Sequence, residues 1–238
     1  VLLYALALFG CDGDKPPSTG KPVIVASIYP IADIVSQLVG EHAQVITLLP
    51  GGASPHGFEL TPRQLADIQR ADTIVLVGMN MDPWADKAAR MVSGHEPMVL
   101  RFSVLVGLEE PKDDAHAHHD HHHNHDHAHD EHDHDHDHAG VNSHLWLDPA
   151  LTQRFVTSLG EQLSKRYPAH AEMIYQHTQS FADELAMIES EYKPRFDALM
   201  QKQLVTFHNA FDMLAAHFGL HLVMHLPALL QIVHRRCC

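Results

Sequence analysis

The chain has 238 residues, of which 45% are hydrophobic, and this is enough for one large domain or two smaller ones with their own cores. The formal net charge is −14, but nine of the 30 acidic residues lie within 113–137, so one stretch carries much of the charge. Lysine and arginine total only 16 and form no basic patch with interleaved aromatic residues, so we expect no nucleic-acid partner.

The first ten residues, VLLYALALFG, form an apolar run that is followed by Cys11 and a polar stretch. The run is too short to span a bilayer and has the length of the apolar core of a secretion signal. Leu8-Phe9-Gly10-Cys11 resembles the lipobox of bacterial lipoproteins, in which the cysteine is lipidated and becomes the first mature residue. We therefore expect 1–21 to be a signal and tether, with a membrane anchor at Cys11. A buried first strand with an incidental cysteine is the alternative.

Strands and helices are predicted to alternate from residue 22 to residue 102. Short β-branched runs indicate strands, and apolar residues at helical spacing indicate helices. The predicted strands are 22–30, 45–49, 73–78 and 98–102, and the predicted helices between them are 31–40, 61–71 and 82–92. This alternation predicts an α/β fold with a parallel sheet wrapped by helices.

The segment 113–143 interrupts this pattern with a tract of histidine, aspartate and alanine. Its thirteen clustered histidines are His116, His118, His119, His121, His122, His123, His125, His127, His129, His132, His134, His136 and His138. Because 113–140 contains no large apolar residue, it cannot offset the entropy of ordering, and we expect a mobile, solvated loop. Imidazole suits zinc, copper and nickel, so the tract predicts an auxiliary set of weak metal sites. A polar linker without a specific role is the alternative.

The rest of the chain predicts a long helix and the start of a second lobe. Helices are predicted at 148–166 and 168–199, and the second would be roughly 48 Å long, enough to join two lobes. A strand at 204–207, a helix at 209–218 and a strand at 220–224 follow. The predicted domains are thus an N-terminal lobe at 22–147, helices at 148–200 and a C-terminal lobe that starts at 201–238. A second lobe needs more strands than this, so we expect a truncated or frame-shifted product with an incomplete lobe.

Three histidines outside the tract lie where an α/β sheet places ligands, in loops and at strand ends. His56 lies in PGGASPHGFELTP after a predicted strand, His144 lies in HLWLDP before a predicted helix, and His208 lies in VTFHNAF at the end of a predicted strand. The remaining histidines outside the tract are assigned no metal-binding role. On polar helix faces or in loops lie His42, His95, His170 and His177, and in the atypical C-terminal end lie His217, His221 and His225.

The motifs PGxxSPHxFxxxP, HxWLDP and FHxAF occur in this order and together resemble the metal-binding solute-binding proteins of bacterial zinc and manganese ABC importers, the cluster A-I family. The acidic, His-rich insertion before HxWLDP is similar to the zinc branch. The resemblance covers about residues 21–222 and implies that His56, His144 and His208 bind metal between two α/β lobes. It also implies that the residue before the first histidine can be an acidic ligand, but this chain has Pro55 there.

We therefore expect a monomeric protein, periplasmic or on the outer face of the cytoplasmic membrane, that captures Zn²⁺ and delivers it to an ABC permease. Three imidazoles and a carboxylate or water satisfy the tetrahedral preference of zinc. A zinc buffer that works through the His-rich loop, or a manganese-binding member of the same family, remains open. An enzyme is not expected, because HExxH is absent and the sequence places no acidic residue as a general base.

Overall fold

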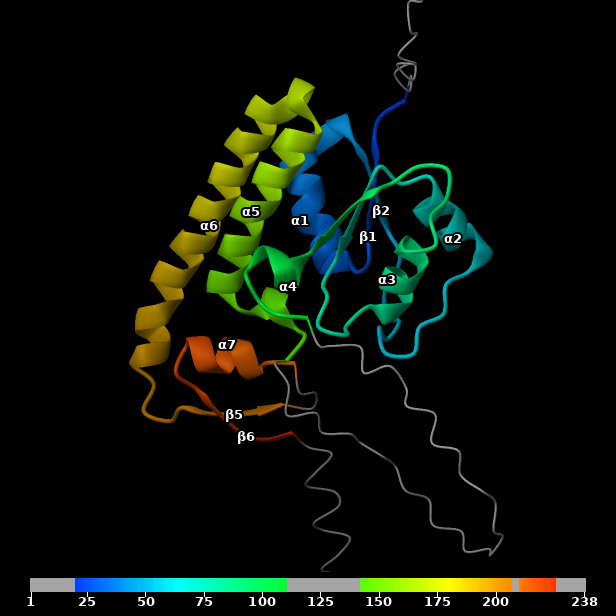
Figure 1. The fold of residues 1–238 in the computed structure, drawn as a ribbon. Helices are drawn as coiled ribbons and strands as arrows, with labels where there is room; N and C mark the ends of the chain where they lie inside the picture. The colour runs from blue at the N-terminus through cyan, green and yellow to red at the C-terminus, as the bar shows by residue number, and fades with distance from the viewer. Residues whose placement is uncertain (1–19, 111–141, 207–209, 226–238) are drawn as a thin grey trace, which may run out of the picture.

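The computed structural model describes residues 20–110, 142–206 and 210–225, which form two unequal lobes joined by a long helix (Figure 1). The first lobe is built on a four-stranded parallel sheet in the order β2-β1-β3-β4. Its strands are β1 (Val23–Ala26), β2 (Gln44–Thr47), β3 (Thr73–Leu76) and β4 (Met98–Arg101). The predicted α/β class with a parallel sheet is therefore correct.

Helices cover both faces of this sheet (Figure 1). On one side lie α2 (Pro62–Gln69) and α3 (Pro83–Ala89), and on the other lie α1 (Tyr29–Val39) and α5 (Pro149–Arg166). Successive residues of β1 point to opposite faces, so Ile24 packs in the core under α1 and α5 whereas Val25 packs in the core under α2 and α3. Both central strands are apolar runs because both of their faces are buried.

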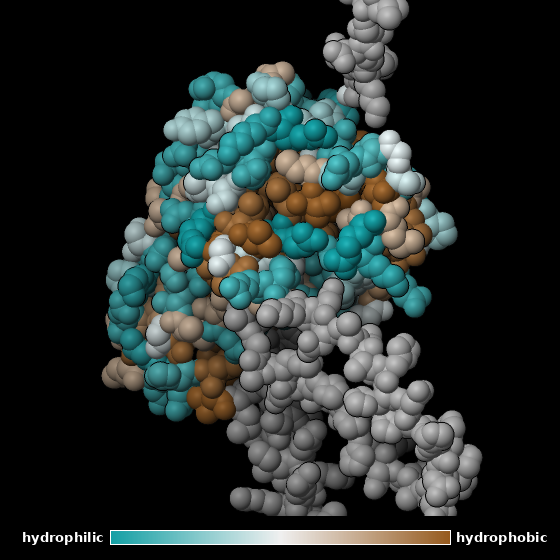
Figure 2. Space-filling model, in the orientation of Figure 1, coloured by the Kyte–Doolittle hydropathy of each residue, from teal (hydrophilic) through white to brown (hydrophobic). Residues whose placement is uncertain are grey.

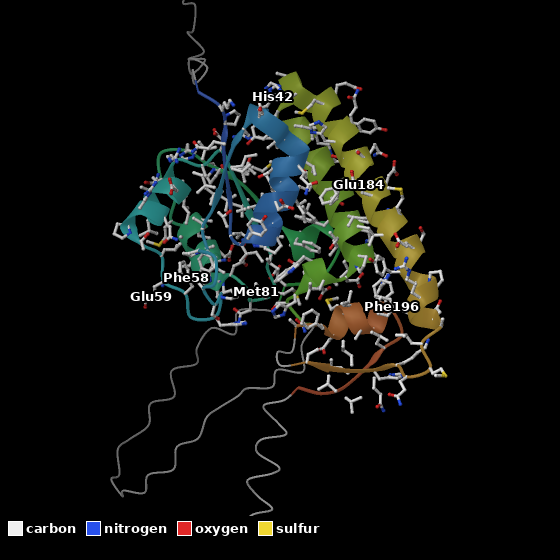
Figure 3. The ribbon with its side chains drawn as sticks, turned by 180° about the vertical axis from the view of Figure 1, so that it is seen from behind. His42, Phe58, Glu59, Met81, Glu184 and Phe196 are labelled. Carbon is white, nitrogen blue, oxygen red and sulfur yellow. The ribbon has the colours of Figure 1, made fainter. Side chains whose placement is uncertain are left out.

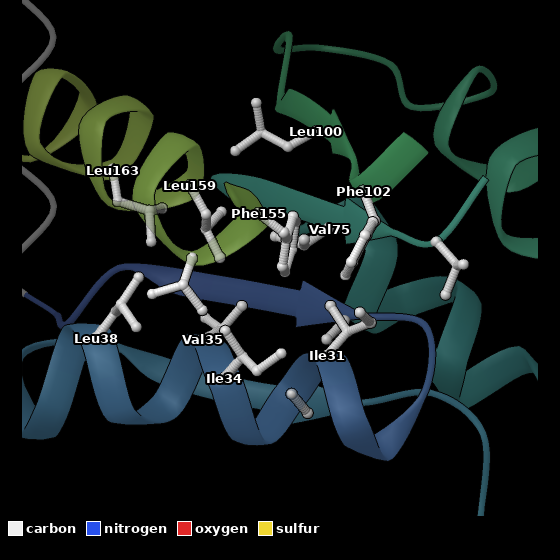
Figure 4. Packing of buried hydrophobic residues seen from close by; sticks show 14 of the residues in the cluster. Ile31, Ile34, Val35, Leu38, Val75, Leu100, Phe102, Phe155, Leu159 and Leu163 are labelled. Atoms are coloured by element: carbon white, nitrogen blue, oxygen red, sulfur yellow. The ribbon is translucent and has the colours of Figure 1, made fainter. Parts of the chain in front are cut away.

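The larger core lies between the sheet, α1 and α5 (Figure 4). Phe155, Leu159 and Leu163 recur every four residues along α5 and are fully buried on its inner face. The Phe155 ring stacks on Phe102 at 4.1 Å between centroids. Phe102 begins α4 (Phe102–Leu105), a short helix directly after β4 that the sequence did not predict.

The long helix α6 (Ala171–Asp197) packs alongside α5 and then continues into the second lobe (Figure 1). Its 27 residues span about 40 Å. It starts after a short 3₁₀ turn, so it begins slightly later than predicted, and it runs through Pro194 to its end. The two helices approach closely at Gly160, where an added Cβ would overlap the buried Thr178 side chain.

The second lobe contains β5 (Gln203–Thr206), α7 (Asp212–His217) and β6 (His221–His225). The two strands pair in parallel, and α7 lies between them and the first lobe (Figure 1). Val205 and Val223 are exposed, and Figure 2 shows apolar surface at this end of the molecule. In the described ranges, no helix combines the length and apolar character needed to cross a membrane. Cys11 and the histidines of the tract lie outside the described residues.

We expect Gly160→Ala to lower the free energy of unfolding by about 1–3 kcal/mol, because the new methyl group overpacks the contact with Thr178. This cost outweighs the gain of about 1 kcal/mol in helix propensity. Urea denaturation followed by circular dichroism measures the change. The double variant Gly160→Ala with Thr178→Ala is the control and should lose less stability than the two single variants predict together. A Gly160→Ala chain as stable as wild type would contradict the close approach.

Candidate metal site

His56 lies on the loop between β2 and α2, and two contacts with Trp84 hold this loop on the first lobe. The indole Nε1–H of Trp84 donates to the carbonyl oxygen of Pro55 over 2.9 Å, and the Phe58 ring meets the same indole edge-on at 4.9 Å between centroids. Gly57 has a φ of +71°, a left-handed value that favours glycine. The His56 side chain itself is exposed, so an anchored loop presents it to solvent.

The far end of the same loop is fixed where α2 begins. Thr61 and Gln64 form a reciprocal capping box, in which the Thr61 hydroxyl accepts from the Gln64 backbone N–H and the Gln64 side chain accepts from the Thr61 N–H. The Gln64 Nε2 group also donates to the Leu48 carbonyl oxygen over 2.5 Å. The helix start is thereby tied to the end of β2, which limits the positions open to the His56 loop.

His144 is half-buried just before α5, and Asn142 orients its ring. The Asn142 Oδ1 atom accepts from the His144 backbone N–H over 3.0 Å and lies 2.6 Å from His144 Nδ1. A backbone N–H can only donate, so the Asn142 atom that faces it is the oxygen, and Nδ1 of His144 must be protonated to donate to it. In a neutral ring Nε2 then carries the lone pair, which is the atom that a metal binds.

The segment after His144 is fixed on the first lobe. Leu145 is fully buried, and the Thr152 hydroxyl donates to the Trp146 carbonyl oxygen over 3.0 Å. Asp148 caps α5, because its Oδ1 atom accepts from the backbone N–H groups of Ala150 and Leu151 at 2.9 and 3.2 Å. The Trp146 ring lies 5.3 Å from the His144 ring. His144 therefore sits between an oriented amide and a capped helix.

His208 lies outside the described residues, between the end of β5 and the start of α7 in the sequence. The structure therefore places two of the three candidate ligands, both in the first lobe. Figure 3 shows Phe58, on the His56 loop, and Met81, after β3, at the end of the first lobe nearer the second lobe. The His144 segment contacts α7 through a hydrogen bond of 3.3 Å from Asn142 Nδ2 to Asp212 Oδ2. That His56, His144 and His208 share one metal ion remains a prediction.

Two carboxylates accept hydrogen bonds from the turn after β3, and sequence reasoning did not predict these contacts. Asp82 is buried and accepts from the backbone N–H groups of Val77 and Gly78 at 2.7 and 3.1 Å. Glu110 accepts from the N–H of Met79 over 2.9 Å, and Met79 has a positive φ of 51°. Burial raises the pKa of Asp82, because loss of water disfavours the carboxylate more than these N–H donors favour it. Both groups hold the turn in shape.

Asn142 and His217 are further residues whose roles the sequence did not predict. An amide two residues before a candidate ligand is the only signal for Asn142 in the sequence. His217, to which the sequence assigned no role, is only 14% exposed, and its two ring nitrogens face Asp148 and Glu189.

A chain with two parallel-sheet lobes on one long helix, and with histidine on a loop after a strand, has the architecture of a two-lobed solute-binding protein. Residues 24–229 match the family described as zinc-uptake complex component A, periplasmic, and the chain belongs to this family. The resemblance inferred from the three histidine motifs is therefore confirmed. This family consists of solute-binding transport proteins and not of enzymes, as the sequence analysis expected.

Named relatives and solved structures agree with this family. The high-affinity zinc uptake system protein ZnuA of Paracoccus denitrificans is 36% identical over 216 residues, which are 86% of this chain and 66% of that protein. The zinc-binding lipoprotein AdcA of Streptococcus pneumoniae is 30% identical over 222 residues, 92% of this chain and 41% of that protein. The chain thus spans less than two thirds of either relative.

The crystal structure of the Zn(II)-bound ZnuA-like domain of Streptococcus pneumoniae AdcA superposes with a TM-score of 0.67 at 25% identity. The superposition covers 86% of this chain and 67% of that one. The crystal structure of the metal-dependent lipoprotein YcdH from Bacillus subtilis gives the same TM-score and the same identity.

We expect the stability difference between wild type and Asp82→Asn to shrink as the pH rises from about 4 towards neutrality. The folded-state pKa of Asp82 lies above the unfolded value, so the folded state binds the proton more tightly. The contribution of Asp82 to stability therefore decreases as the pH rises from its unfolded-state pKa through its folded-state pKa. Asparagine does not titrate, so the variant does not show this decrease. Urea denaturation of both chains across this pH range measures the difference.

Asp33→Asn, on the exposed face of α1, is the control for loss of one negative charge. The opposite result is that the difference in free energy of unfolding between wild type and Asp82→Asn grows with pH. It would mean that the folded state stabilises the carboxylate better than the unfolded state does, and it would contradict this prediction.

Proposed function

We propose that this chain binds Zn²⁺ outside the cytoplasmic membrane through His56, His144 and His208 and delivers it to an ABC permease. The observation that carries the proposal is the orientation of His144, whose Nδ1 is held by Asn142 so that Nε2 keeps its lone pair for a metal. Membership of the zinc-uptake family supports zinc as the cargo.

The chemistry of the donors supports zinc and its later release. Zinc accepts imidazole nitrogen at about 2.0–2.1 Å in tetrahedral sites, and water or a carboxylate completes three imidazoles. The residue before His56 is Pro55, so that position supplies no carboxylate. Neutral ligands on loops form a more open site than four thiolates do, which suits a protein that must pass its cargo on.

The His-rich tract and Cys11, which lie outside the described residues, have auxiliary roles in this proposal. The thirteen histidines between His116 and His138 act as weak sites that raise the local zinc concentration near the tight site. Cys11 carries a lipid that holds the chain, as a monomer, at the outer face of the membrane. The curated name of the Streptococcus pneumoniae relative, a zinc-binding lipoprotein, supports the anchor.

We expect zinc titration by calorimetry to separate a single tight site from several weak ones in the full chain. Deletion of 115–139 should remove the weak sites and leave the tight one, because the tract supplies none of the three proposed ligands. The triple variant His56→Ala, His144→Ala, His208→Ala should do the opposite and lose the tight site alone. A matched control replaces the exposed His221 by alanine and should change neither class.

Loss of the tight site on deletion of the tract would favour a zinc buffer that works through the His-rich loop. Manganese that competes with zinc at equal concentration would favour the manganese alternative. Delivery is a separate step: cells that hold the permease should take up radioactive zinc with the wild-type chain and fail to do so with the triple variant.

A further inference from the structure

The short helix α7 contacts the segment that carries His144 at both of its ends. At the start of α7, Asp212 Oδ2 accepts from Asn142 Nδ2 over 3.3 Å. At its end, His217 Nδ1 lies 3.4 Å from Asp148 Oδ1, which caps α5. One helix of the second lobe therefore contacts the residues that stand two before and four after His144.

A further pair of contacts fixes the last turn of α7. The Nε2 atom of His217 lies 3.1 Å from Glu189 Oε1 on α6, so the imidazole joins α7 to both long helices. Phe218, the next residue, stacks on Phe196 of α6 at 4.4 Å between ring centroids (Figure 3 labels Phe196). This end of the helix is consequently held in place, and the position of Asp212 at its other end is defined.

The Asn142 amide is held in one orientation from two sides: its oxygen accepts from the His144 backbone N–H, and its NH₂ group donates to Asp212. An ionised carboxylate only accepts hydrogen bonds, so Asp212 must face the NH₂ group of Asn142. The amide is planar, so the oxygen then points the other way, towards His144 Nδ1. With the amide reversed, the NH₂ group would face both the His144 backbone N–H and Nδ1, and Asn142 could no longer accept from the Nδ1–H tautomer.

We infer that Asp212 is a positioning residue for the metal site: from the second lobe, it helps hold the Asn142 amide whose oxygen selects the Nδ1–H tautomer of His144. The inference rests on the proposed role of His144 as a zinc ligand. Partners that hold the far nitrogen of a metal-bound histidine typically change metal affinity by 10–100-fold. Asp212 stands one step further out, behind such a partner. The ligand in the first lobe is thus oriented by a residue four positions after His208, the candidate ligand from the second.

The test measures zinc affinity at the tight site of the full chain by competition with a chromophoric chelator. Asp212→Ala should weaken binding by about tenfold, because the NH₂ group of Asn142 loses the carboxylate that holds it from the second lobe. Asp212→Asn should retain most of the affinity, since its amide oxygen still accepts from Asn142. Asp183→Ala, an exposed aspartate on α6, is the control for loss of charge. Circular dichroism establishes that each chain is folded.

A double-variant cycle distinguishes positioning from a general loss of structure. In a chain that already carries Asn142→Ala, Asp212→Ala should cause little further loss of affinity, because its effect is transmitted through that amide. Additive losses, or a loss in Asp212→Asn equal to that in Asp212→Ala, would overturn the inference. Nitrogen NMR of the zinc-free chain should also show the Nδ1–H tautomer of His144 in wild type and a mixture in Asp212→Ala; an unchanged tautomer would overturn it as well.

The proposed function fails separately from this inference. If His144→Ala leaves the tight site intact, His144 is not a ligand and the zinc-binding proposal is wrong at that residue. If His144→Ala removes the tight site while Asp212→Ala leaves affinity unchanged, the ligand assignment stands and only the positioning role is refuted.

Discussion

Parallel pairing places the carboxyl ends of all four strands of the first lobe at one edge of the sheet, and the candidate site depends on this constraint. The loop that carries His56 leaves this edge after β2, and the turn around Asp82 leaves it after β3. Trp84, which follows that turn, donates to the carbonyl oxygen of Pro55 on the neighbouring loop. This hydrogen bond holds the His56 loop and the segment after β3 together.

The segment from Asn142 to Asp148 combines three tasks within seven residues. Asn142 orients His144, Leu145 anchors the segment in the core, and Asp148 caps α5. Each task uses a different kind of interaction: an amide hydrogen bond, apolar burial and a helix cap worth about 1 kcal/mol. Because α7 contacts both ends of the segment, movement of the second lobe relative to the first would act directly on the orientation of His144.

The sequence predicted those parts of the structure that depend on neighbours along the chain. The strands of both sheets are apolar runs, and the α5 start was evident from Asp148 followed by proline. Thr61 followed by proline likewise marked the start of α2, whose capping box involves only residues three apart. The short α4 was missed because four residues give no helical period to detect.

Contacts between distant residues were beyond sequence reasoning. Asn142 and Asp212 are 70 positions apart, and neither residue type indicates a partner. His217 illustrates the same limit: its burial comes from the packing of α7 against α5 and α6, and nothing in the local sequence distinguishes it from an exposed histidine. The candidate ligands were found by a different signal, three short motifs in a characteristic order, which carry information about a family and not about geometry.

The described carboxylates near this edge of the first lobe make hydrogen bonds that maintain the fold. Asp82, Glu110 and Asp148 each accept hydrogen bonds from backbone N–H groups. If such a carboxylate turned to bind a cation, it would leave a donor without an acceptor, at a cost of about 1–3 kcal/mol for a buried group. His56 is exposed, and Asn142 holds Nδ1 of His144 so that in a neutral ring the lone pair lies on Nε2. Manganese prefers oxygen donors whereas zinc accepts imidazole readily, so the engagement of these carboxylates in the fold favours the proposed zinc cargo over manganese.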